Sequence, residues 1–139
     1  MRVALPCAFI LTSCATTRAH VMEAAPKLAP SCRAAVHLFT SPERVPAPYV
    51  DLALLRVVGN DFAGEGTLFG SLKGKAAQLG ANGLIYRTMN TSPGLFQDPT
   101  GEAVAIYIPS DTARIAGECA KEKVVADSAR QAERPMGLP

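Results

Sequence analysis

Residues 67–89, TLFGSLKGKAAQLGANGLIYRTM, decide the fold of this chain. Apolar side chains recur every three or four residues from Leu68 to Leu79, as they do on the buried face of an amphipathic helix. Gly80 follows the last of them, where a residue with left-handed backbone commonly ends a helix. Residues 84–89 come directly after a short turn and are predicted to form a strand. The stretch therefore predicts a helix, a tight stop and a strand.

Three small or polar residues add detail to this helix. Thr67 is expected to be the N-cap, because its hydroxyl can accept a hydrogen bond from a free N–H of the first turn. Gly70 and Gly74 each cost roughly 1 kcal/mol relative to Ala inside a helix. Since they lie four residues apart, we expect them to form a small face that a strand can approach closely.

Three further segments are predicted strands: residues 35–40, 49–58 and 102–108. Apolar side chains alternate along them, which is typical of strands in a sheet. Residues 41–48 contain three prolines and are expected to form an extended loop, because proline removes a hydrogen-bond donor from a sheet. The order strand, strand, helix, strand, strand predicts an α+β fold of the ββαββ type. We expect an antiparallel four-stranded sheet with one helix packed on one face.

Residues 90–101 are predicted to form a long hairpin loop with an apolar pair, Leu95 and Phe96, in its middle. Such a pair in a polar loop can fold back as a small plug, or it can form an exposed contact point. We keep both alternatives open.

Length and composition exclude several classes of function. The 139 residues allow one domain, and the net charge of +2 is mixed along the chain rather than clustered. A nucleic-acid partner is therefore not expected, because nucleic-acid-binding proteins usually present a clustered basic face. Aromatic residues make up 6% of the chain and Trp is absent, which disfavours a stacking platform for bases or sugars. We find no catalytic constellation and no metal-ligand set, and we expect no cofactor.

The N-terminus has the outline of an export signal. Arg2 supplies a positive charge, residues 3–11 are largely apolar, and LTSC follows at residues 11–14. This run resembles the signal peptide and lipobox of bacterial lipoproteins. The resemblance implies that residues 1–13 are removed and that Cys14 becomes the acylated first residue, which anchors the protein to a membrane. A plain cleaved signal and an ordinary N-terminal strand of a cytosolic protein are the alternatives.

The same resemblance bears on location. In Gram-negative lipoproteins an Asp directly after the acylated Cys favours retention in the inner membrane, and this chain has Ala15 there. We therefore expect a lipid-anchored protein of the cell envelope, held on the outer membrane and facing the periplasm.

The remaining chain is divided by composition. Residues 14–31 are rich in Ala, Thr and Pro without periodicity, and we expect a flexible tether there. Residues 32–119 are the predicted α+β domain. Residues 120–139 form an Ala-rich charged tail that is expected to be partly helical or disordered, with a frayed helix over residues 118–131.

The cysteines support the same location. If Cys7 is removed with the signal and Cys14 is acylated, Cys32 and Cys119 are left in an oxidising compartment. They flank the predicted domain, so we predict a disulfide between them, with two free thiols as the alternative. In the chain-entropy model, closing so long a loop contributes about 4–5 kcal/mol.

Three motifs carry a resemblance to known proteins: FTS at residues 39–41, PAPY at residues 46–49 and KAAQLGANGLI at residues 75–85. They resemble a group of small bacterial envelope proteins of uncharacterised function. More distantly, they are similar to the domain of the outer-membrane stress-sensor lipoprotein of the Rcs phosphorelay. The resemblance implies a ββαββ domain on a lipid anchor, stabilised by disulfide. The sensor has two disulfides where this chain can form one, so no signalling role and no functional residue is carried over.

These observations favour a non-enzymatic envelope lipoprotein whose domain contacts another envelope protein. One alternative is a periplasmic domain that binds a small ligand or metal, through the face of the sheet or through the loop with Leu95 and Phe96. The other is a small enzyme, which would need a Cys–His pair such as Cys32 with His37.

Overall fold

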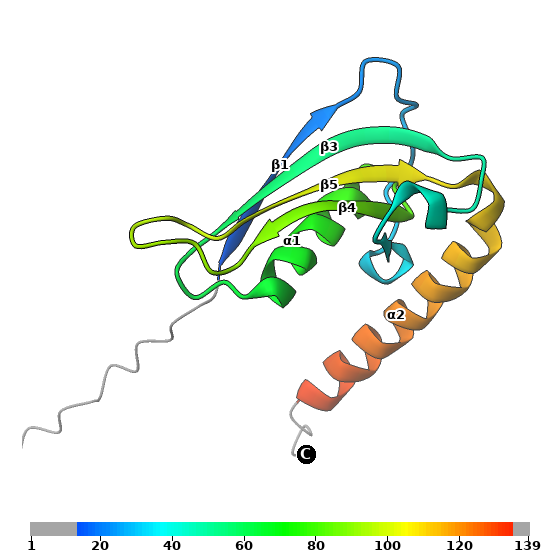
Figure 1. Cartoon of the computed structure of the whole chain (residues 1–139). Coiled ribbons are helices and arrows are strands. Elements are labelled where there is room, and N and C mark those ends of the chain that lie inside the picture. Colours follow the sequence, from blue (N-terminus) through cyan, green and yellow to red (C-terminus); the bar gives the residue numbers. More distant parts are fainter. Residues whose placement is uncertain (1–13, 135–139) are drawn as a thin grey trace, which may run out of the picture.

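The computed structural model describes residues 14–134, in which a five-stranded mixed sheet carries one packed helix and one projecting helix (Figure 1). The helices are α1 (Glu65–Gln78) and α2 (Thr112–Glu133). The strands are β1 (Ala15–Val21), β2 (His37–Phe39), β3 (Val50–Gly59), β4 (Gly83–Asn90) and β5 (Thr100–Tyr107), in the spatial order β1-β3-β5-β4-β2. The predicted signal peptide, residues 1–13, and the end of the predicted tail, residues 135–139, lie outside the described residues.

The α+β class is confirmed, but the antiparallel four-stranded sheet is wrong. β3, β5 and β4 are antiparallel as expected, whereas β2 lies at the edge and pairs with β4 in parallel. The reason is the proline-rich loop, residues 41–48, which carries the chain from β2 to β3 on the other side of β4 and β5. The alternation of apolar residues along a strand indicates which face is buried, but it does not indicate whether the neighbouring strand is parallel or antiparallel.

The fifth strand is β1, which lies within the stretch that was expected to be a flexible tether. Its seven residues pair antiparallel with β3, from Ala15 opposite Gly59 to Val21 opposite Ala53. The next residues are also bound to the domain, because Met22 N–H donates to Leu52 O and Ser31 N–H donates to Ala77 O. The tether prediction is therefore wrong. Small Ala and Thr side chains face α1 here, so the strand lacks the large apolar residues that reveal periodicity in a sequence.

Helix α1 packs on one face of the sheet, as predicted. Leu68, Leu72 and Ala76 are fully buried against sheet residues such as Leu55 and Leu84. This apolar layer is the main core of the domain. Its lateral edge is closed by a hydrogen bond of 2.7 Å between the hydroxyls of Thr17 in β1 and Ser71 in α1.

The ends of α1 confirm one expectation and correct another. Gly80 has a φ of 80°, so the left-handed stop after the helix is confirmed. The helix begins earlier than Thr67, because Gly64 takes the extended N-cap conformation and its carbonyl accepts the Leu68 N–H. Glu65 then places a negative charge in the first turn, which the helix dipole favours.

Gly70 and Gly74 of α1 do not meet a strand. A Cβ on Gly70 would have no neighbouring atom within 4 Å, and one on Gly74 would lie 2.9 Å from the Arg33 guanidinium. The expectation of a close strand approach is therefore wrong, because these positions point away from the sheet.

The opposite face of the sheet is covered at one end only. There the proline-rich loop places Val45 over Ile85, Ile106 and Ile108, which form a second, smaller core. At the other end the face is open to solvent and carries charged side chains such as Arg56.

Helix α2 is longer than the frayed helix that was expected over residues 118–131. It has 22 residues, starts at Thr112 and has no buried residue. Figure 1 shows it leaving the sheet at the end of β5 and projecting from the domain. Within residues 14–134, no helix is both long and apolar enough to span a bilayer.

Candidate functional site

Cys14 lies at one end of the sheet, directly before β1, and its thiol is free and exposed. Its backbone is held in place, because the Cys14 carbonyl accepts the Asn60 N–H at 2.9 Å. A sulfur in this position is accessible to modification, and the backbone of the residue that carries it is bonded to the domain.

Two loops meet the chain at this end of the sheet. One is residues 60–64 between β3 and α1, where the Asn60 side chain accepts the Phe62 N–H at 3.2 Å and orders the turn. The other is the hairpin loop of residues 91–99, and the Gly59 N–H donates to Pro99 O at 2.8 Å. Figure 1 shows the β4–β5 hairpin, the loop before α1 and the start of β1 together at this end.

Leu95 and Phe96 project from the hairpin loop. Their exposures of 90% and 103% exclude the plug and leave the exposed contact point of the two alternatives. Phe62 in the neighbouring loop is 59% exposed. A single Phe in a polar turn has no periodic partner, so sequence reasoning did not identify it. We call these three side chains the apolar tip.

The backbone at Phe96 is unusual. Its φ of 64° lies in the left-handed region, which costs an L-residue with a bulky side chain roughly 1–2 kcal/mol. The turn is closed by the Gln97 N–H, which donates to Gly94 O. The loop thus holds an aromatic ring in solvent at a strained position, although Gly or Asn would suit that conformation better.

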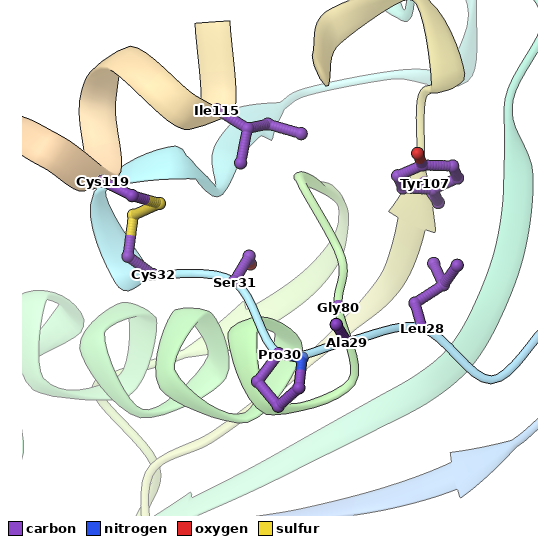
Figure 2. A pocket seen from close by; sticks show the side chains of 9 residues that line it. All are labelled: Leu28, Ala29, Pro30, Ser31, Cys32, Gly80, Tyr107, Ile115 and Cys119. Atoms are coloured by element: carbon purple, nitrogen blue, oxygen red, sulfur yellow. A yellow bond between two sulfur atoms is a disulfide. The ribbon is translucent and has the colours of Figure 1, made fainter. Parts of the chain in front are cut away.

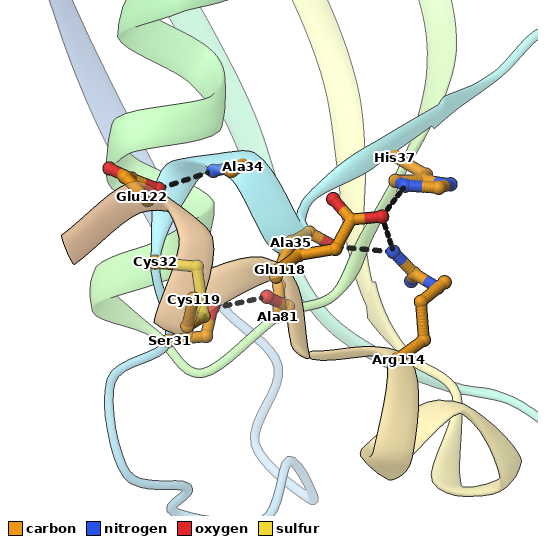
Figure 3. Close-up of a disulfide and its surroundings, with 10 residues drawn as sticks. All are labelled: Ser31, Cys32, Ala34, Ala35, His37, Ala81, Arg114, Glu118, Cys119 and Glu122. Carbon is orange, nitrogen blue, oxygen red and sulfur yellow. Dashed lines mark hydrogen bonds and ion pairs between the residues drawn. A yellow bond between two sulfur atoms is a disulfide. The ribbon is translucent and has the colours of Figure 1, made fainter. Parts of the chain in front are cut away.

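The disulfide lies at the opposite end of the domain. Cys32 and Cys119 are joined with a Cα–Cα distance of 5.5 Å, which confirms the predicted pairing (Figure 3). The bond links α2 to the short 3₁₀ turn Arg33–Ala35. Two hydrogen bonds support it, from Ala34 N–H to Glu122 and from Arg114 to Ala35 O.

A charged cluster lies beside the disulfide. Arg114 pairs with Asp111 at 2.9 Å, and the Glu118 carboxylate lies 3.6 Å from Arg114 and 3.4 Å from His37 Nε2. Figure 3 shows His37 directed at this carboxylate. With Cys32 in the disulfide, the sulfur that a Cys32–His37 catalytic pair would need is already bonded.

A shallow hollow of about 440 Å³ adjoins the disulfide (Figure 2). Leu28, Pro30, Tyr107 and Ile115 contribute to its wall, and no charged residue lines it. The hollow could take a small apolar group that also hydrogen-bonds to the tyrosine hydroxyl. As for metals, residues 14–134 contain no group of three or more His, Cys, Asp or Glu side chains that could hold an ion.

Asn82 is an important residue that sequence reasoning treated only as part of a turn. It is fully buried, its Nδ2 donates to Ile108 O at 2.9 Å, and its Oδ1 accepts the Ile108 N–H at 2.7 Å. The side chain thereby fixes the end of β5 and the start of the turn that leads to α2. A buried amide with both groups paired is a positioning element rather than a reactive group.

Comparison with known proteins adds little to this geometry. The sequence matches no protein family and no curated protein. Among solved structures, the chain is similar to the crystal structure of the Francisella virulence factor FvfA, with a TM-score of 0.49 and 13% identity over 66% of this chain and 96% of that one.

Proposed function

We propose that the chain is a lipid-anchored protein of the bacterial cell envelope, acylated at Cys14, whose domain serves in interaction or sensing and not in catalysis. The anchor would hold it on the outer membrane, facing the periplasm. The observation that carries the proposal is the state of the cysteines. Cys14, in the LTSC motif, is free and exposed, whereas Cys32 and Cys119 are paired.

Two further features support an envelope location. A disulfide that closes a long loop in a small domain is typical of oxidising compartments. The resemblance to small envelope lipoproteins points to the same place, through the motifs in residues 39–49 and 75–85.

A role in interaction is supported by the kinds of side chain that are exposed. The charged groups near the disulfide pair with one another: Glu118 lies between Arg114 and His37. Exposed apolar side chains, in contrast, gather on the loops beside Cys14. Arrangements of this kind suit contact with a surface or partner better than acid–base chemistry.

The intact mass of protein isolated from the membrane fraction of a bacterial host tests this proposal. We expect a chain that begins at Cys14, carries added acyl mass and is two hydrogens lighter than its reduced form. The Cys14→Ser variant should lack the acyl mass. An unprocessed chain in the cytosol with four free thiols would contradict the proposal.

The second candidate is a periplasmic binding domain for a small apolar ligand, because the hollow beside the disulfide is lined mainly by apolar groups and the Tyr107 ring. Small phenols or short fatty acids should then raise the melting temperature of the wild-type protein. Ile115→Asp should abolish that shift, and Val124→Asp, on the exposed part of α2, should leave it unchanged. No shift with any such ligand would exclude this candidate.

A further inference from the structure

The apolar tip lies at the end of the molecule where the lipid would be attached. Among residues 14–134, the five most exposed large apolar side chains include all three members of the tip, Phe96, Leu95 and Phe62. The other two, Val124 and Val125, lie on the projecting helix α2. The three tip residues come from two loops far apart in sequence. These loops meet in the fold, because Asp61, next to Phe62, lines the same hollow as Leu95 and Phe96.

Hydrogen bonds connect the tip to Cys14. Asn60 N–H donates to the Cys14 carbonyl, and the adjacent Gly59 N–H donates to Pro99 at the base of the hairpin loop. Phe62 is two residues from Asn60, so its backbone lies at most about 10 Å from the Cys14 carbonyl. No tether separates the two, because β1 begins at Ala15.

This arrangement restricts how an anchored domain can sit. If a long tether followed Cys14, the domain could take any orientation, and the tip could face a distant partner. With Cys14 bound to the sheet, acyl chains on its sulfur draw the same end of the domain against the bilayer. The exposed rings and the Leu side chain are then the first groups to meet the lipid.

We propose that Phe62, Leu95 and Phe96 insert into the interface of the bilayer that holds the acylated Cys14, and so fix the orientation of the domain on the membrane. This inference rests on the proposed lipidation. Insertion removes apolar surface from water and accounts for the strained backbone at Phe96, which presents an aromatic ring outward at the outermost loop. The opposite end, with the disulfide and the start of α2, is directed away from the membrane.

The absence of Trp from the sequence allows a direct test. Phe96→Trp and Phe62→Trp each introduce a single fluorescent reporter at the tip. Leu38→Trp is the matched control, because Leu38 is an exposed apolar residue on β2, far from the tip. Leu38 pairs with Leu84 of β4, and Leu84 lies about 20 Å from Asn90, where β4 ends beside the hairpin loop. Each full-length variant is isolated from membranes with its lipid and reconstituted into phosphatidylcholine vesicles with brominated acyl chains.

We expect bromine to quench the reporters of Phe96→Trp and Phe62→Trp at least about threefold more strongly than the reporter of Leu38→Trp, because contact quenching does not reach across about 20 Å. The emission of the tip reporters should also shift to the blue relative to detergent-free protein whose acyl chains have been removed. Equal quenching in all three variants, or none at the tip, would overturn the inference.

Two further outcomes are separable. The intact mass of the same samples reports lipidation independently, so acylated protein with an unquenched tip refutes insertion and leaves the proposed function in place. If the tip reporters shift to the blue only in vesicles made from whole envelope extract, and not in pure lipid, a protein covers the tip and the lipid contact is wrong.

Discussion

At the scale of single residues, Gly80 and Phe96 share a left-handed backbone but differ in what surrounds them. A Cβ on Gly80 would lie 2.4 Å from the Leu28 Cβ and 2.7 Å from Ala29 O, so both conformation and space require glycine. The side chain of Phe96 is fully exposed, and the residue takes the same conformation without being a glycine. Gly80 ends helix α1 where the chain packs closely against Leu28 and Ala29, whereas Phe96 presents its side chain to solvent.

Gly80→Ala should destabilise the protein by about 2–4 kcal/mol, because the side chain adds left-handed strain to a clash with backbone. The matched control is Gly70→Ala, also a Gly-to-Ala change in or beside α1, where an added Cβ meets nothing within 4 Å. That variant should be more stable by about 0.5–1 kcal/mol. Urea unfolding measures both. If both variants changed the free energy of unfolding in the same direction, the different backbone requirements of Gly80 and Gly70 would be contradicted.

Phe96→Asn should raise the stability of the protein in solution by about 0.5–1 kcal/mol, because Asn tolerates the left-handed region and no buried contact is lost. Leu95→Asn makes a similar apolar-to-amide change at the neighbouring position, whose φ is not positive, and should alter stability by less than about 0.5 kcal/mol. Thermal unfolding distinguishes the two. A loss of stability in Phe96→Asn would show that the ring packs against the fold.

At the scale of elements, helix α2 depends on its first turns. Hydrogen bonds, an ion pair and the disulfide join it to the rest of the domain through Arg114, Glu118, Cys119 and Glu122, all in its N-terminal half. Residues 123–133 are exposed, and a helical segment this short is marginal in water without other contacts. The disulfide therefore joins two residues that are 87 positions apart in the sequence, and it also attaches helix α2 to the domain.

Replacing both Cys32 and Cys119 by Ser should lower the free energy of unfolding by about 2–5 kcal/mol and reduce helical ellipticity, because α2 loses its covalent attachment. Amide exchange should become faster over residues 112–122 and stay fast over residues 123–134. A reductant should reproduce the effect in the wild-type protein and have no effect on the double variant. Unchanged exchange over residues 112–122 would show that the ionic contacts alone hold the helix.

The elements that could be predicted from sequence are those with large apolar side chains at regular spacing. Helix α1 and strands β3, β4 and β5 all have them, and their bounds lie close to the predicted ones. Strand β1 could not be predicted, since Ala15 and Thr17 meet α1 through small side chains. The parallel pairing of β2 depends on the path of a loop, which no local pattern records.

The candidate site divides in the same way. The Cys32–Cys119 pair could be predicted from residue type and position. Cys14 was singled out by its resemblance to a lipobox, and the sequence left open whether Leu95 and Phe96 are buried or exposed. Phe62 and Asn82 could not be predicted, because their roles depend on segments distant in sequence. The loop of Phe62 meets the hairpin loop at Asp61, and Asn82 binds Ile108. Only the fold, which brings separate segments of the chain together, reveals these roles.

At the scale of the whole molecule, charge is distributed unevenly along the axis of the sheet. The segments at the tip, residues 59–65 and 90–101, contain Asp61, Glu65 and Asp98 and no Lys or Arg. The basic residues lie elsewhere, for example in α2, so the net charge of +2 is not representative of the end that holds Cys14 and the apolar tip. The tip is therefore suited to zwitterionic lipid rather than to an anionic surface.

This polarity predicts how lipid charge affects insertion. Adding anionic phosphatidylglycerol to the vesicles should weaken the quenching of the reporter in the Phe96→Trp protein. Each carboxylate at the surface is repelled by about 1 kcal/mol, or about fivefold in the ratio of inserted to free tip. Raising ionic strength from about 0.1 M to about 1 M shortens the screening length from about 10 Å to about 3 Å and should restore the quenching.

Adding Asp61→Asn and Asp98→Asn to the reporter protein should remove most of the dependence on lipid charge. Quenching that instead increases with anionic lipid would mean that basic side chains outside the tip make the contact, and that the domain lies on the membrane with a different face.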